Sequence, residues 1–136
     1  KVGDLVRFHT AHKLTLMAHS VGAYQLLGRL VAVARPTRQV EAEYTEGFMR
    51  ALETIATARR HTNVLQHMAG YFKTTLDEGS RRELQATIEE YRVGLVPLVV
   101  PITLIRHHVR RLGVAYLAGQ IYLDPHPREL MLRNHV

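Results

Sequence analysis

The 136-residue chain contains no cysteine, and three of its long stretches contain no acidic residue. Without cysteine it has no disulfide, no thiol nucleophile and no cysteine-ligated cluster, a composition that fits a cytoplasmic protein. The longest apolar run, Gly94–Ile105, includes two prolines and is too short to span a bilayer. We therefore expect buried core in that run and no membrane partner. A chain of this length folds as one domain without a metal or a disulfide.

The acidic residues are unevenly distributed. Nine of the twelve Asp and Glu lie in Glu41–Glu53 and Asp77–Glu90, whereas Leu5–Val40, Thr54–Leu76 and Tyr91–Leu123 contain none. A solvated helical face normally mixes both signs of charge, because Glu–Lys pairs four residues apart stabilise it. With a net charge of +6, cationic stretches that lack acids predict a surface for an anion, and nucleic acid is the leading class.

Apolar residues recur with a helical period along the chain, and no alternating strand pattern is present. The sequence predicts an all-α fold, a compact single-domain bundle of about six to seven helices. The helices and helical turns are expected at Leu5–Ala18, Val21–Ala34, Thr37–Thr57, Arg60–Leu76, Ser80 to the region of Gly94–Pro97, Pro101–Leu112, Ala115–Tyr122 and Pro127–Arg133. Ser20 and Thr37 are the expected N-caps, Ser80–Glu83 reads as a capping box, and Pro101 suits a first helical turn.

The segment Arg60–Leu76 has one apolar side and one unusual polar side. The apolar side is predicted to face the core and contains Val64, Leu65, Met68, Ala69, Phe72 and Leu76. The opposite side carries amides, histidine and arginine where a solvent face usually carries Glu and Lys: Arg59, Arg60, Asn63, Gln66, His67, Gly70 and Thr74. Arg, Asn and Gln form paired hydrogen bonds with base edges, and Arg also binds phosphates.

Two further interpretations concern this polar side. Asn63, Gln66 and His67 could instead bond neighbouring helices inside the bundle, as buried polar groups usually do. Gly70 costs helix stability, so its expected place in mid-helix predicts that another group approaches closely there.

The helix expected at Pro101–Leu112 is divided more sharply. Its core side contains Leu98, Ile102, Ile105, Val109 and Leu112. Its opposite side contains Thr103, Arg106, His107, Arg110 and Arg111, with no acid nearby in the sequence. Such a cluster predicts a phosphate-binding stripe. The alternative is a solvated face whose cations pair with acids of the preceding helix.

Two histidines of the first helix, His9 and His12, are three residues apart, a spacing at which they could share a metal ion. No acid between Leu5 and Val40 completes such a site, so satisfied, semi-buried histidines are the preferred interpretation. His107 and His108 are adjacent and diverge by about 100° on a helix, a weaker metal signal. No catalytic residue, metal site or cofactor is predicted on this chain.

Four blocks of the sequence are similar to a known family. The blocks are HTAHKLTLMAHS (His9–Ser20), RHTNVLQHMAGYF (Arg60–Phe72), YRVGLVPLVVPITLIRHHVRR (Tyr91–Arg111) and YLDPHPRELMLRNHV (Tyr122–Val136). They resemble the YbgA-like family of bacterial helical domains, long filed as a domain of unknown function. The resemblance covers almost the whole chain, so residues 1–136 are expected to form one such domain. Because the first residue is Lys1, it could be the C-terminal part of a longer parent, and the ending LRNHV is expected to be the natural C-terminus.

This resemblance also carries an expectation about function. In the family the domain occurs alone or appended to an iron–sulfur domain similar to thiouracil desulfidases. The fused proteins are implicated in removing sulfur from 4-thiouridine in transfer RNA, which implies that the helical part recognises the RNA. An iron–sulfur cluster would belong to the appended domain, whose cysteines these 136 residues do not contain.

We interpret the chain as an RNA-binding domain with transfer RNA as the expected partner. The residues expected to bind it are Arg59, Arg60, Asn63, Gln66, His67, Lys73, Arg106, His107, Arg110 and Arg111. One alternative is a small enzyme that uses His9, His12, His67 or His107 for acid–base or metal chemistry. Another is a protein-interaction module with an acidic partner. The sequence leaves the choice of RNA and the oligomeric state open.

Overall fold

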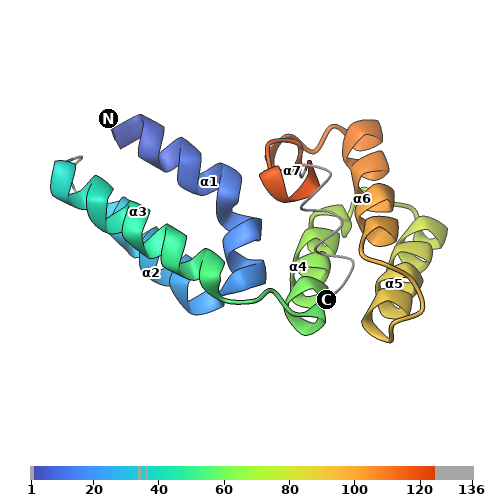
Figure 1. The fold of residues 1–136 in the computed structure, drawn as a ribbon. Helices are drawn as coiled ribbons and strands as arrows, with labels where there is room; N and C mark the ends of the chain where they lie inside the picture. The colour runs from blue at the N-terminus through green and yellow to red at the C-terminus, as the bar shows by residue number, and fades with distance from the viewer. Residues whose placement is uncertain (1, 34, 36, 125–136) are drawn as a thin grey trace.

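The computed structural model describes residues 2–33, 35 and 37–124, and all of its regular structure is helical (Figure 1). The elements are α1 (Val2–His19), α2 (Val21–Val33), α3 (Arg38–Glu53), α4 (Ala58–Ala69), α5 (Glu78–Arg92), α6 (Val99–Leu112), α7 (Ala115–Ala118) and the 3-10 turns η1 (Gly70–Phe72) and η2 (Ile121–Leu123). The predicted all-α bundle is confirmed. The turn expected at Pro127–Arg133 lies outside the described residues.

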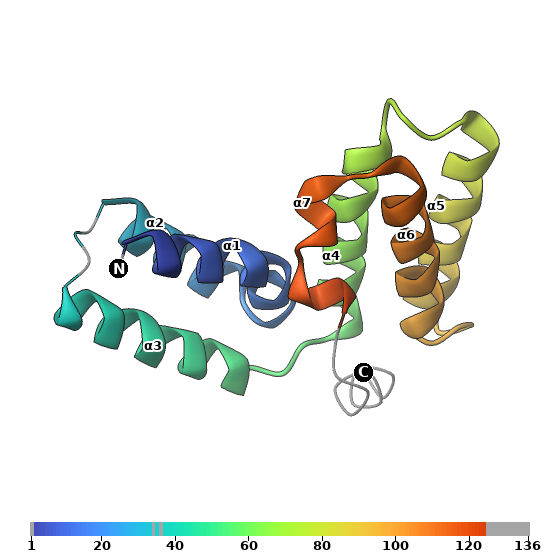
Figure 2. The same cartoon turned by 90° about the horizontal axis from the view of Figure 1, so that it is seen from above.

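The helices form two groups that lie side by side (Figures 1 and 2). In the first group α1, α2 and α3 pack against one another, and in the second α4, α5 and α6 pack together with α7 and η2 beside them. Helix α1 also contacts α4 and η2, so it joins the two groups.

The buried side-chain amide of Gln120 fastens this junction. Its NH2 group donates to the carbonyl of Thr10 at 2.7 Å, and its oxygen accepts from the N–H of Leu14 at 3.4 Å. Those two backbone groups are four residues apart, which is the pair that an α-helix joins. A side chain of the second group therefore takes part in the hydrogen bonding of α1.

Side-chain caps set most helix starts, and some of them differ from expectation. Ser20 and Thr37 accept hydrogen bonds from the N–H groups of Ala23 and Val40, as predicted. The third helix ends at Glu53, because Thr57 has extended backbone angles and caps α4 by accepting from the N–H of Arg60. The predicted continuation through Thr57 is therefore wrong.

The capping box at Ser80–Glu83 is also wrong. Asp77 is the N-cap of α5, and its carboxylate accepts from the N–H of Ser80 at 3.0 Å. The aspartate caps a helix that begins three residues earlier, so Ser80 lies inside the first turn. The end of α5 agrees with expectation, since the helix stops at Arg92 and Gly94 has a positive φ of 83°.

The helix expected to reach Leu76 instead ends at Ala69 and continues as the single turn η1. A Cβ atom added to Gly70 would meet nothing within 4 Å. The predicted close approach at Gly70 is therefore wrong, because the glycine marks the change from α-helix to 3-10 turn at an exposed position.

The core consists of two clusters of different size. The larger lies in the second group and includes Phe72, Ile88 and Ile105, together with Leu14 and Met17 from α1. The smaller contains Leu16, Leu27, Tyr44 and Ala51 and lies among the first three helices. Helix α1 supplies both, because Leu14 and Leu16 point to different sides of one helix. No described helix is long and apolar enough to cross a membrane.

Candidate nucleic-acid interface

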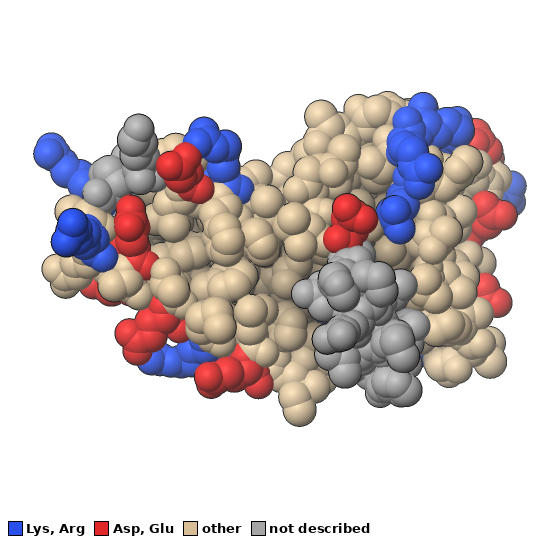
Figure 3. Space-filling view, turned by 45° about the horizontal axis from the view of Figure 1, so that its top comes forward, with Lys and Arg blue, Asp and Glu red and all other residues tan. Residues whose placement is uncertain are grey.

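The polar side of α6 is a solvent-exposed cationic stripe, which we call the α6 stripe and define as Arg106, His107, Arg110 and Arg111. All four side chains are exposed, and the side facing the bundle buries Ile102, Ile105 and Val109 among others. Arginines at 106 and 110 lie on successive turns, about 6 Å apart along the axis. In Figure 3 a run of Lys and Arg atoms covers part of the second helix group, with a few acidic atoms at its edges.

Within the described chain, acidic residues lie close to the α6 stripe only at its two ends. Arg106 approaches Asp124 at 3.9 Å, with both side chains largely in solvent. The pKa of Asp77 lies below its ordinary value because the side chain and backbone N–H of Ser80 hydrogen-bond to it, and Arg111 adds a smaller attraction. Among the described residues no ion pair joins α6 to the preceding helix, and only the weak attraction between Arg111 and Asp77, at the N-cap of α5, acts in the sense of that alternative. Exposed pairs of this kind contribute little stability and are easily exchanged for another anion.

The polar side of α4 is a second exposed surface, which we call the α4 stripe and define as Arg59, Asn63, Gln66 and His67. These side chains are in solvent, so the alternative that Asn63 and His67 lie inside the bundle is wrong. Gln66 does bond a neighbouring helix, donating to the Gln85 side chain at 2.8 Å, but at the surface.

Two more predicted residues border the α4 stripe. Arg60 is half-buried, and its guanidinium donates to the carbonyl of Ile55 at 2.9 Å. Lys73 is exposed after η1, and it lines a hollow of about 510 Å³ between α4 and α5 with Gln66 and Arg81. A second hollow of about 760 Å³ is lined by Thr57, Arg59, Arg60, Thr62, Asn63 and Gln66.

The two stripes do not share a groove. Among the described residues, none from α6 lines either hollow beside α4. The α6 stripe borders η2 and the start of α5, whereas the α4 stripe borders the middle of α5 and the linker before α4. The ten predicted residues therefore form two surfaces, and only a large ligand could contact both.

The paired histidines of α1 have separate environments. His9 is 4% exposed, its Nδ1 is 2.8 Å from the hydroxyl of Tyr44, and its ring stacks on Tyr24. Burial lowers the pKa of His9, with smaller contributions from Lys13 and His12. His12 instead donates through Nδ1 to the carbonyl of Phe8 at 2.8 Å. No group of three metal-binding side chains occurs in the part of the chain that the structure describes.

Two other histidines are buried in the second group. His61 Nδ1 is 2.6 Å from the hydroxyl of Tyr122, on a side chain 61 positions away. His108 is 4% exposed, and neither of its ring nitrogens has a hydrogen-bond partner among the described residues. Burial lowers the pKa of His108, and Arg111 and His107 act in the same direction.

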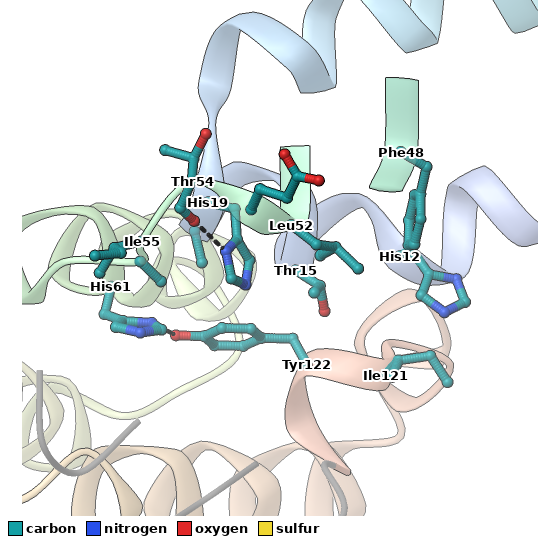
Figure 4. Close-up of a pocket in the computed structure, with 13 residues that line it drawn as sticks. His12, Thr15, His19, Phe48, Leu52, Thr54, Ile55, His61, Ile121 and Tyr122 are labelled. Atoms are coloured by element: carbon teal, nitrogen blue, oxygen red, sulfur yellow. Dashed lines mark hydrogen bonds between the residues drawn. The ribbon is translucent and has the colours of Figure 1, made fainter. Parts of the chain in front are cut away.

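A cavity of about 590 Å³ lies at the junction of the two groups (Figure 4). Helix α1 lines it with His12, Thr15 and His19, which follow one side of the helix. Helices α3 and α4, the linker between them and η2 complete its wall with Phe48, Leu52, Glu53, Thr54, Ile55, Ala56, His61, Ile121 and Tyr122. The ring of His19 is held through Nδ1, which donates to the carbonyl of Thr54 at 2.7 Å.

Comparison with known proteins identifies the family. Residues 13–127 match the family described as "Protein of unknown function (DUF1722)". The chain belongs to this family. It is also 36% identical over 135 residues to the uncharacterized protein YbgA of Escherichia coli strain K12, an alignment that covers 97% of this chain and 80% of YbgA. No solved structure matches the chain significantly.

The matched part of this DUF1722 domain contains both stripes and most of the cavity, whereas His9 and His12 lie before it. The cavity was not predicted from the sequence. Its only local signal was the spacing of His12, Thr15 and His19 along one helix, and the residues that close it come from segments 30 to 110 positions away.

Proposed function

We propose that this DUF1722 domain binds RNA, and that the α6 stripe carries the binding. The observation that supports the proposal is the exposure of Arg106, His107, Arg110 and Arg111 on one side of a helix whose other side is buried. The packed side of α6 holds the helix backbone in place, so the spacing of the arginines along it is set before an anion binds. Phosphates release bound counterions when arginines neutralise them, and this release favours binding.

The spacing of the α6 stripe suits a chain of phosphates better than a single anion. Three arginines within six residues would repel one another unless a polyanion neutralised them together. Each guanidinium presents paired donors that match phosphate oxygens. Contacts of this kind fix the register of an RNA without reading its sequence.

The α4 stripe supplies groups that can discriminate between RNAs. Asn63 and His67 are exposed and make no hydrogen bond to another described side chain, so their polar atoms are open to a ligand. Side chains cannot easily read the deep groove of duplex RNA, and they recognise shape, loops and unpaired bases instead. A folded RNA could reach both stripes, because its arms present phosphates in several directions.

Transfer RNA is the RNA class that we propose. It is supported by the similarity to domains appended to thiouridine desulfidases, and it places the domain in the cytoplasm. In this proposal the 136 residues recognise the RNA and carry out no sulfur chemistry, because they contain no cysteine to ligate an iron–sulfur cluster.

Fluorescence anisotropy of labelled transfer RNA at salt concentrations from 50 to 300 mM tests the proposal. Log affinity should fall with log salt by about 0.7–0.9 per phosphate neutralised, which gives a slope of several units. Duplex DNA of equal length should compete poorly. A salt-independent affinity, or equal competition by the DNA, would contradict the proposal. A partner that survives nuclease treatment during purification would favour the protein-interaction alternative.

A further inference from the structure

The cavity at the junction has mainly apolar walls and a few polar groups. The walls are mostly aliphatic and aromatic, with Phe48, Leu52, Ile55, Ile121 and Tyr122 among them. A volume of about 590 Å³ lies within the range of pockets that hold small organic ligands, roughly 300–1,000 Å³. The space therefore suits a flat molecule with two apolar faces.

The polar groups at the cavity are mainly acceptors. A backbone carbonyl can only accept, so the contact with Thr54 places the proton of a neutral His19 on Nδ1 and leaves Nε2 as an acceptor. Figure 4 shows this second nitrogen turned toward the space beside Thr15 and Tyr122. The contact with Phe8 fixes His12 in the same way. Glu53 adds a carboxylate, which also accepts.

Thr15 provides an independent sign of a ligand. Thr15 is among the residues that line the cavity, and its hydroxyl oxygen is buried beneath that wall without a hydrogen-bond partner among the described residues. A buried hydroxyl without a partner is costly, by about 1–3 kcal/mol, unless a bound group satisfies it. This hydroxyl can both donate and accept, so it can pair with a ligand that also has an acceptor.

The charges on the described wall of the cavity disfavour an anion as its ligand. No Lys or Arg is among the described residues that line it, and Glu53 is negative. The ligand must therefore supply N–H donors to the imidazoles and present little negative charge. A planar ring with N–H groups on its edge and apolar faces meets each requirement, and nucleobases have this chemistry.

Cations lie next to the cavity but outside it. The linker residue Ile55 lines the cavity, and its carbonyl accepts from Arg60 at 2.9 Å. Arg60 in turn lines the polar hollow that contains Arg59 and begins at Thr57. An RNA strand that crosses this linker can leave a phosphate at the two arginines while its base enters the cavity.

We propose that the cavity between α1, α3 and η2 binds an unpaired nucleobase, held between apolar walls and read by His19, Thr15 and His12. This inference rests on the proposed function, because the base reaches the cavity as part of the bound RNA. Removing a base from its stack costs a few kcal/mol, and a site of this kind therefore favours loops and unpaired positions. Stacking on aromatic side chains offsets part of that cost.

NMR titration of the ¹⁵N-labelled chain with the four ribonucleosides, and separately with ribose 5-phosphate, tests the site. At least one nucleoside should produce saturable shifts at the amides of Thr15, His19 and Phe48. Ribose 5-phosphate should produce none, since no cation is among the described residues that line the cavity. If ribose 5-phosphate binds as well as the nucleosides, or if no nucleoside shifts these amides, the inference is wrong.

Matched variants assign the binding to named groups. Thr15→Val keeps the side-chain shape and removes the hydroxyl, and it should weaken nucleoside binding by about three- to tenfold. Thr45→Val, on the exposed surface of α3, is the control and should bind as the unaltered chain does. His19→Phe should weaken binding further, and Thr15→Val remains informative if that variant does not fold. Unchanged affinity in both cavity variants would overturn the assignment.

The same experiments separate this inference from the proposed function. If Arg106→Glu with Arg110→Glu abolishes binding of transfer RNA and nucleoside shifts remain, the α6 stripe and the base site are both supported. If transfer RNA binds with a steep salt dependence and no nucleoside enters the cavity, only the base site is wrong. If nucleosides bind and transfer RNA does not, the proposed function is wrong and the cavity serves a free ligand.

Discussion

The two helix groups differ in how they divide apolar and charged residues. The group α4–η2 buries Phe72, Ile88 and Ile105 completely and gathers arginines on α6. The group α1–α3 has a small core, and large apolar side chains are more than half exposed in both groups, such as Leu26 in the first and Leu95 in the second. Figure 3 shows charges of both signs mixed over this first group. A dense core supports a surface that holds like charges together, which the smaller group does not do.

The acidic residues are distributed in a similar way in both groups. They lie mainly on one helix of each group, α3 and α5, and there they pair within the helix: Glu46 with Arg50 at 2.5 Å and Glu89 with Arg92 at 2.5 Å. The neighbouring helices therefore keep their cations largely unneutralised. In α1 and α2 these cations are far apart, whereas α6 carries three arginines within six residues.

The largest expected effect concerns the two cores. Phe72→Ala should lower the free energy of unfolding by about 3–5 kcal/mol, because the fully buried ring leaves a cavity that its neighbours cannot fill. Leu27→Ala should cost about 2 kcal/mol, since the small cluster can relax around it. Urea denaturation followed by circular dichroism measures both. A larger loss for Leu27→Ala would reverse the comparison of the groups.

The next effect concerns the surface of the second group. Arg106→Glu with Arg110→Glu should weaken binding of transfer RNA at least about tenfold and lower the salt slope by about 1.5, for two lost phosphate contacts. The melting temperature should hardly change, because exposed substitutions usually alter stability by less than about 0.5 kcal/mol. Arg38→Glu with Arg50→Glu on α3 changes the net charge equally and serves as the control. Equal losses of affinity in the two double variants would show that binding depends on the net charge and not on the α6 stripe.

A smaller effect concerns two of the buried histidines, His9 in the first group and His108 in the second. Burial lowers the pKa of both His9 and His108 in the folded chain, so folding favours their neutral forms. The free energy of unfolding is therefore not reduced by these histidines above their ordinary pKa of 6.5. It falls as the pH drops below 6.5, because the unfolded chain then binds protons that the folded chain does not. Glu83 and Asp77 oppose the shift of His108 but do not reverse it.

His108→Leu isolates this pH dependence. The variant removes two ring nitrogens that have no partner among the described residues, so it should be at least as stable as the unaltered chain at pH 7.5. Between pH 7.5 and 5 it should lose less stability than the unaltered chain. Denaturation curves at both pH values measure this, and an identical loss would show that folding does not lower the pKa of His108.

The smallest expected effect concerns the α4 stripe. Asn63→Ala and His67→Ala should each change the free energy of unfolding by less than about 0.5 kcal/mol, because both side chains are exposed. They should reduce discrimination between transfer RNA and an unrelated folded RNA while the salt slope stays constant. Anisotropy measurements with both RNAs decide this. Unchanged discrimination would leave the α6 stripe as the only site.

Sequence alone determined the helices, two of their caps and the two polar stripes. The caps Ser20 and Thr37 and the arginines of α6 depend on spacings of about four residues. A pattern of that length can be recognised in the sequence. The same local argument failed where two residues competed for one helix end. Thr57 could have ended α3 as a helical residue or started α4 as a cap, and Asp77 displaced Ser80 in the same way.

The tertiary structure decided which of these surfaces lie together. It separated the α4 stripe from the α6 stripe, paired His61 with Tyr122, and brought Gln120 to the backbone of α1 at Thr10, 110 positions away. It also closed the cavity around Thr15 and His19 from four segments. Such contacts depend on how whole helices cross, which is set by the packing of many side chains at once and leaves no signal in local spacing.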